Sequence, residues 1–139
     1  MLDGGEIQRI RLRTRRLIAQ QRALVQELLR LREHLGGSLI VRWAVCGKEG
    51  CACHRGDRHG PYYVLSTRSG GRGGYTYIRG PKVARAQGLV RQHRRFQAGL
   101  RRLKQLNEEL VLALRRYREA TGRRVLRTFS EEPSRKAMV

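Results

Sequence analysis

Two long stretches of apolar residues at three- and four-residue spacing most constrain the fold of this chain. The first stripe, broken only at Thr14 and Gln21, consists of Ile7, Ile10, Leu17, Leu24, Leu28, Leu31 and Leu35. The second begins after Pro81 and consists of Leu89, Phe96, Leu100, Leu103, Leu110, Leu114 and Tyr117. This spacing places one apolar seam along an α-helix, so each stretch predicts one long helix.

Neither helix can bury its seam alone, so we expect the two to pair antiparallel as a coiled-coil-like hairpin. The first helix is predicted over residues 1–36, where a pair of glycines ends it, and the second over residues 82–122, which ends at Gly122. Residues 123–139 form a basic tail that we expect to be mostly disordered.

The predicted pairing also implies neighbours for particular residues. At the far end of the hairpin we expect Ile7 and Ile10 to lie beside Leu110 and Leu114. Apolar residues off the seams would allow a second hairpin to dock, which predicts a homodimer formed through the helices. These off-seam residues are Ile18, Val25, Leu29, Val90, Val111 and Leu112.

Between the helices, residues 37–81 are rich in β-branched and aromatic residues and predict a small β head. Three short strands fit residues 38–45, 61–66 and 75–78, and the glycine-rich residues 69–74 are expected to form a flexible hairpin loop. The predicted fold class is therefore α+β, with a long antiparallel helical hairpin and a three-stranded antiparallel head.

Three thiols and two imidazoles are concentrated in the fourteen residues from Cys46 to His59. Cys46, Cys51 and Cys53 with one histidine supply the four soft donors of a tetrahedral zinc site, which would staple the head. We favour His59 as the fourth ligand, because His54 adjoins Cys53 and its imidazole starts from the opposite side of the chain, but His54 stays an alternative. The competing interpretation is a loop with half-buried thiols or a Cys46–Cys51 disulfide.

The sequence does not favour an enzyme. A catalytic zinc keeps one coordination position open, whereas three thiolates and one histidine fill the shell. The chain has only 11 acidic residues, and they form no paired-carboxylate arrangement that acid–base catalysis could use.

The charge balance predicts a polyanionic partner, because 31 Lys and Arg against 11 Asp and Glu give a formal net charge of +20. Residues 82–128 hold 14 of the cations and 3 acids. We therefore predict nucleic-acid binding, with DNA favoured over RNA and RNA kept as an alternative. The predicted contacts are Arg91, Arg94, Arg95, Arg101, Arg102 and Lys104 in the second helix and Arg42, Arg68 and Arg72 in the head.

Two alternatives to nucleic-acid binding remain. The cations can form a solvated helix face, or the chain can be a protein-interaction adaptor whose seams and charge recruit an acidic coiled coil. No apolar run is long enough to span a membrane, and the amino-terminal residues lack a signal-peptide pattern. Together with the clustered cysteines, this predicts a cytoplasmic protein without a membrane partner.

Aromatic residues stand among the arginines of the head. Strand alternation places Tyr75 and Tyr77 on one face, where aromatic rings with Arg42 and Arg72 could enter a groove or stack on bases. Aromatic residues in short strands more often form the core, so both interpretations stay open.

The block Cys-Gly-Lys-Glu-Gly-Cys-Ala-Cys followed by His-Gly-Pro-Tyr-Tyr resembles a small prokaryotic family of unknown function. The resemblance covers the head and the start of the following helix, and members of that family often occur near mobile-element or phage genes. Its three cysteines and the histidine before Gly-Pro fall on Cys46, Cys51, Cys53 and His59. The resemblance therefore implies the same four ligands and a DNA-related context, but no activity.

Overall fold

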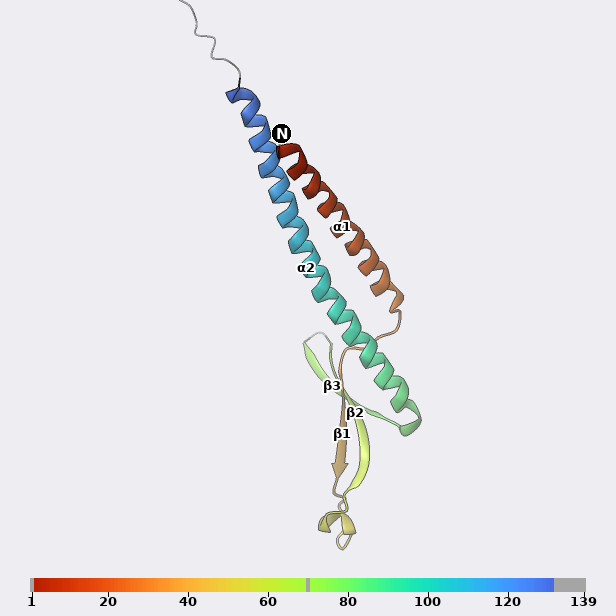
Figure 1. Cartoon of the computed structure of the whole chain (residues 1–139). Helices are drawn as coiled ribbons and strands as arrows, with labels where there is room; N and C mark the ends of the chain where they lie inside the picture. The colour runs from red at the N-terminus through yellow and green to blue at the C-terminus, as the bar shows by residue number, and fades with distance from the viewer. Residues whose placement is uncertain (1, 70, 132–139) are drawn as a thin grey trace, which may run out of the picture. The chain divides into compact units, whose positions relative to one another are not determined.

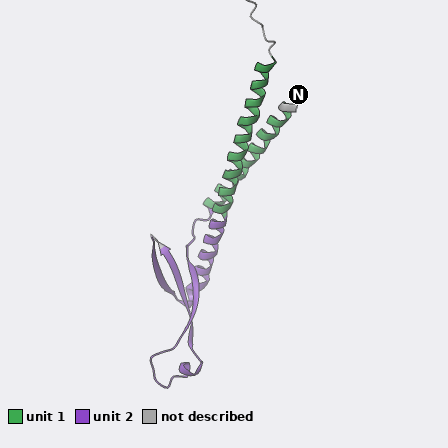
Figure 2. Ribbon diagram, turned by 90° about the vertical axis from the view of Figure 1, so that its left-hand side faces the viewer, with its two compact units in different colours: residues 1–29, 99–139 green, residues 30–98 purple. Residues whose placement is uncertain are grey.

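The computed structural model describes residues 2–69 and 71–131, which form two compact units (Figure 1, Figure 2). Of these, the helical unit contains residues 2–29 and 99–131, and the β unit contains residues 30–69 and 71–98. Along the chain the elements follow the order α1, β1, η1, β2, β3, α2. Among the described residues no helix combines the length and the apolar composition needed to span a membrane.

The helical unit consists of α1 (Leu2–Arg30) packed against the second part of α2 (Gly80–Ser130). Its buried cluster is made of Leu17, Leu106 and Ala113, with Leu24 and Leu110 packed against it. Polar contacts between the helices are Glu6–Arg123, Arg11–Tyr117 and Gln21–Asn107. Residue numbers rise in α1 as they fall in α2, so the helices pair antiparallel as predicted.

The register of this pairing differs from the prediction. Ile7 and Ile10 lie between Glu6 and Arg11 in α1, and these flanking residues contact Arg123 and Tyr117. The prediction that both isoleucines lie beside Leu110 and Leu114 is therefore wrong. It assumed helices with matching ends, whereas α1 ends earlier and α2 continues further than the sequence indicated.

Helix α1 ends at Arg30, so the predicted end at residue 36 is wrong. Residues 31–36, which follow the helix, make contacts with other parts of the β unit. The amide of Leu35 donates to the carbonyl of Leu89 at 3.1 Å, and the ring of His34 stacks on Phe96 with centroids 4.7 Å apart. These tertiary contacts compensate for the helical hydrogen bonds that residues 31–36 would have made.

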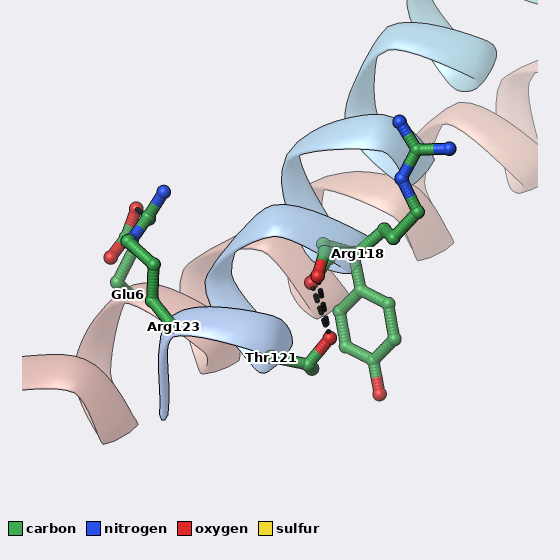
Figure 3. Close-up of polar contacts among 5 residues, drawn as sticks. Glu6, Arg118, Thr121 and Arg123 are labelled. Atoms are coloured by element: carbon green, nitrogen blue, oxygen red, sulfur yellow. Dashed lines mark hydrogen bonds and ion pairs between the residues drawn. The ribbon is translucent and has the colours of Figure 1, made fainter. Parts of the chain in front are cut away.

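Helix α2 continues to Ser130, so the predicted end at Gly122 is wrong, as is disorder in residues 123–130. Gly122 adopts no positive φ, and the hydroxyl of Thr121 donates to the carbonyls of Tyr117 and Arg118 within the helix (Figure 3). Arg123 then pairs with Glu6 of α1 at 3.1 Å. The rest of the predicted tail, residues 132–139, lies outside the described residues.

The β unit contains a three-stranded antiparallel sheet in the order β1 (Ser38–Ala44), β2 (His59–Ser69), β3 (Arg72–Ile78). Strands β2 and β3 are longer than predicted, whereas β1 ends one residue before its predicted end at residue 45. The loop expected over residues 69–74 is largely strand. Gly73 and Gly74 pair with Arg68 and Thr67, so backbone hydrogen bonding extends the hairpin through these glycines. The α+β class with a three-stranded antiparallel sheet is confirmed.

The buried residues of the β unit lie in the central strand and in the first part of α2. Val64 and Leu65 of β2 are buried, as are Val83, Ala86 and Val90 of α2. Val90 was expected on an exposed off-seam face, and this expectation is wrong because Val90 is only 5% exposed. A short 3-10 helix, η1 (Ala52–Arg55), lies in the connection between β1 and β2 and carries the buried Cys53.

Candidate metal centre

The far end of the β1–β2 hairpin gathers the cysteine-rich connection. Cys46 follows β1, Cys51 caps η1, Cys53 lies within η1, and His59 is the first residue of β2. The pair Ala44–His59 closes the ladder between the two strands, so the sheet brings the two ends of the connection together. The β-hairpin thus supplies a fixed frame for side chains from both sides of the loop.

The four donor atoms of Cys46, Cys51, Cys53 and His59 all lie within 4.8 Å of one another. The sulfurs of Cys46 and Cys53 are 3.5 Å apart, and the sulfur of Cys51 is 3.4 Å from Nε2 of His59. Four ligands placed tetrahedrally about 2.3 Å from an ion have edges of about 3.8 Å. The cluster therefore has the size and the donor set of a metal site.

His54 does not join this cluster, although it lies next to Cys53. Its Nε2 is 3.0 Å from the carbonyl oxygen of Lys48, in the turn that precedes η1. The structure therefore brings together the four residues that the sequence favoured as ligands, with His59 and not His54 as the histidine.

The turn around the cluster depends on backbone hydrogen bonds and on one glycine. The amide of His54 donates to the carbonyl of Cys51 at 3.1 Å, and the amide of Asp57 donates to that of Ala52 at 3.3 Å. Gly56 ends η1 with φ of 117°, a conformation that side-chain-bearing residues rarely adopt. This glycine allows the chain to turn back toward His59.

The pKa values of two thiols in the cluster are shifted in opposite directions. A hydrogen bond from the backbone of Lys48, assisted by His59, lowers the pKa of Cys46 to about 6. Desolvation raises the pKa of the buried Cys53 thiol. Cys46 is thus prepared as a thiolate at neutral pH, whereas Cys53 needs a positive charge beside it to lose its proton.

All six cations predicted on α2 to contact nucleic acid are exposed: Arg91, Arg94, Arg95, Arg101, Arg102 and Lys104. Arg91, Arg94 and Arg95 belong to the β unit and the other three to the helical unit. Arg102 pairs with Glu109 at 3.9 Å. In the described part of the chain no ion pair involves the other five.

In the sheet, Arg42 of β1 and Arg68 of β2 are exposed, and so is Arg72 at the start of β3. The guanidinium carbon of Arg42 lies 5.6 Å from the centroid of the Tyr75 ring.

The sequence did not single out η1 or the backbone of Lys48, which shape the cluster. The helical turn of η1 and the contact of Lys48 with Cys46 depend on backbone hydrogen bonds, which leave no side-chain pattern in the sequence.

The fold and the cluster together define an α+β protein with a Cys3His candidate metal centre at the tip of a β-hairpin. A family model described as Domain of unknown function (DUF6788) matches residues 9–88 of the chain. The chain therefore belongs to this family, and the match includes most of α1 as well as the sheet and the cluster. Neither the curated proteins nor the solved structures contain a match.

Proposed function

We propose that this protein binds nucleic acid through the exposed cations of α2, with DNA favoured over RNA. We also propose that its candidate metal centre holds a structural zinc ion. The observation that carries the proposal is the exposure of Arg91, Arg94, Arg101 and Lys104 along α2. Among the described residues they form no ion pair. Phosphates are the natural counter-charges for such a series, and Arg matches their geometry well.

Zinc is the metal that the donor set favours. Three thiolates and one imidazole are soft ligands that select Zn²⁺ over Mg²⁺ or Ca²⁺, and four protein ligands leave no open position for a substrate. The ion would supply structural cross-linking of the β1–β2 connection, and we propose no reaction for it. Reduced thiols fit a cytoplasmic location. The family resemblance favours a role in DNA transactions of mobile elements or phages.

The proposal is tested by the salt dependence of binding to a fluorescein-labelled oligonucleotide, measured by anisotropy on the full zinc-loaded chain. The test variant replaces Arg91, Arg94, Arg101 and Lys104 by Gln. A matched control replaces four exposed arginines of α1 by Gln and removes the same charge: Arg9, Arg13, Arg16 and Arg22. Gln is nearly as good a helix former as Arg and Lys, so both variants should keep their helices.

We expect the α2 variant to bind weakly and to lose up to about 0.9 from the slope of log affinity against log salt for each phosphate contact removed from duplex DNA. The α1 control should lose less affinity and keep most of the slope, because only long-range attraction is reduced. A parent protein that does not bind, or an α2 variant with the parent's slope, would refute the proposal.

Exposed apolar residues on the helical unit favour a second candidate, a protein-interaction adaptor that includes a homodimer. Val111, Leu112 and Leu29 are 49%, 48% and 72% exposed, which is high for large apolar side chains on long helices. Sedimentation analysis of the parent and of Leu112→Glu distinguishes the candidates. An oligomer that dissociates on this substitution supports the adaptor, whereas a monomer in both cases counts against self-association through this surface.

A further inference from the structure

The strand register places several aromatic and cationic side chains on one face of the sheet. Residues directly opposite each other in an antiparallel sheet point to the same side, and so do residues two apart in one strand. Tyr62 pairs with Arg42, and Val64, two residues on, pairs with Tyr77. By the same rule Tyr75 and Arg68 also lie on this face. We call this set of residues the tyrosine face: Tyr62, Tyr75, Tyr77, Arg42 and Arg68.

The rings of the tyrosine face are not part of the core. Tyr62, Tyr75 and Tyr77 are 45%, 67% and 70% exposed. The aromatic core suggested as one interpretation of the sequence is therefore wrong for Tyr75 and Tyr77. Rings left this open on a sheet face offer flat apolar surface to a partner.

The charge on the sheet selects a polyanion as that partner. The three strands contain Arg42, Arg68 and Arg72 and no Asp or Glu. The guanidinium of Arg42 lies over the ring of Tyr75, which keeps a cation beside a stacking surface. An apolar protein partner would have to bury these arginines without carboxylates from the sheet, which costs desolvation free energy.

One end of the tyrosine face is hollowed. Tyr62 and Tyr77 line a hollow of about 330 Å³ together with Ala44, Val45, Cys46 and His59. This volume is at the low end of small-ligand pockets, which span about 300–1,000 Å³. A hollow of this volume has room for a flat ring the size of a nucleobase.

We propose that the tyrosine face is a stacking platform for unpaired bases, so that the nucleic acid held by this protein is single-stranded. The inference rests on the proposed function and specifies its ligand. Bases in a duplex already stack on each other, and their flat faces are closed to the protein, whereas a single strand can turn its bases onto Tyr rings. The arginines on the same face then lie beside the strand's phosphates.

The experiment compares a labelled single-stranded oligothymidine with a labelled hairpin duplex of equal total charge, at one salt concentration, on the full zinc-loaded chain. The test variant carries Tyr75→Ala and Tyr77→Ala, and Tyr75→Phe with Tyr77→Phe keeps both rings. Thr76→Ala is the matched control, because Thr76 is exposed and lies between the two tyrosines on the opposite face of β3. Zinc content and Trp43 emission show whether each variant is folded.

We expect the parent to prefer the single strand and the double Ala variant to lose roughly fivefold to 150-fold in single-strand affinity for each stacked base that is lost. Duplex affinity should change little, and the Phe variant and Thr76→Ala should bind as the parent does. Equal parental affinity for both probes, or an unchanged single-strand affinity in the folded double Ala variant, would overturn the inference.

These outcomes separate the inference from the proposed function. If the parent binds nucleic acid through the α2 cations but the Ala variant is unaffected, only the stacking platform fails. If the parent binds neither probe, the proposed function fails as well. Binding of a second copy to this face would show as an oligomer that the double Ala variant dissociates, and that result would also overturn the stacking platform.

Discussion

The helical unit and the candidate metal centre hold their structures by different means. In the helical unit, a buried cluster of Leu17, Leu106 and Ala113 is one part of an apolar seam that repeats along two helices. The metal centre has one buried side chain, Cys53, and its geometry depends on four donor atoms and a few backbone hydrogen bonds. Stability in the first is spread over many similar contacts, whereas in the second it is concentrated in a few atoms.

Metal removal should have the largest effect, and it should disturb the metal centre while leaving the helical unit folded. Zinc binding at structural sites contributes about 10–16 kcal/mol in peptides, far more than a single packing contact. A chelator should therefore disorder the β1–β2 connection while the helices keep most of their far-UV circular dichroism. Trp43, the single tryptophan, lies in β1 and beside Gly60, so its emission reports on the sheet end of the connection.

Two histidine variants sharpen this prediction. His59→Ala removes a donor atom from the cluster, and we expect metal analysis to find well below one zinc per chain. His54→Ala is the matched control, because His54 contacts the carbonyl of Lys48 and should leave about one zinc per chain. Equal zinc content in both variants would show that His59 does not bind the ion.

Acidification should have the next largest effect, again confined to the metal centre. The folded pKa of Cys46, about 6, is below its ordinary value of 9.0, so its thiolate stabilises the fold above pH 9 and this contribution is lost as pH falls through 6. We expect metal to stay bound at neutral pH and to be released below about pH 6 as protons compete for this ligand.

A chromogenic zinc indicator measures this release during a pH titration, and helical dichroism provides the comparison. The pKa of Cys53 is shifted in the opposite direction, because burial favours its neutral thiol. A bound metal ion must therefore displace the Cys53 proton at neutral pH. Release centred above about pH 8 would contradict the assignment of Cys46 as the thiolate that is already formed.

The sequence predicted which helices and strands are present better than it predicted where they end. Repeated spacing identified both helices and β-branched residues identified the three strands, because these signals recur along each element. The end of α1 at Arg30 depends on Leu89 and Phe96, which are remote in sequence. No local pattern contains that information, since a helix end is decided by where its backbone groups find partners.

The candidate metal centre was predictable for a different reason. Donor side chains are rare enough that three cysteines and a histidine in one loop indicate a cluster without knowledge of the fold. Gln21 interrupts the apolar stripe of the first helix, and Asn107 is a polar residue in the second helix. In the structure they hydrogen-bond to each other across the helices, so two separate irregularities form one contact that helps to define the register.

Within the helical unit, two glycines of α2 should respond in opposite directions to the same substitution. A Cβ at Gly99 would overlap Cδ2 of the buried Leu28, whereas nothing lies within 4 Å of a Cβ at Gly122. Gly99→Ala gains about 1 kcal/mol of helix propensity but incurs about 1–3 kcal/mol of overpacking, so we expect a net loss of stability. Gly122→Ala should gain about 0.5–1 kcal/mol.

Thermal unfolding followed by helical circular dichroism measures both changes, with the metal centre loaded in each variant. The opposite signs are the important feature, because a general effect of removing glycine from α2 would raise both melting temperatures. A rise for Gly99→Ala as large as that for Gly122→Ala would mean that Leu28 can move aside without loss.

The smallest effect is expected for the ion pair between Glu6 and Arg123, which joins the two helices near the amino-terminal end of α1 (Figure 3). Their side chains are 44% and 53% exposed, so water and salt screen the pair. A double-mutant cycle with Glu6→Gln and Arg123→Gln should give a coupling free energy of about 0.2–1 kcal/mol that decreases as salt is added. The same cycle on Arg102 and Glu109, 3.9 Å apart within α2, is the comparison and should give a smaller coupling, because the contact is longer. A coupling well above 1 kcal/mol for Glu6 and Arg123, unchanged by salt, would show that this exposed contact contributes as strongly as a buried one and that the helical unit, like the metal centre, depends on a few atoms.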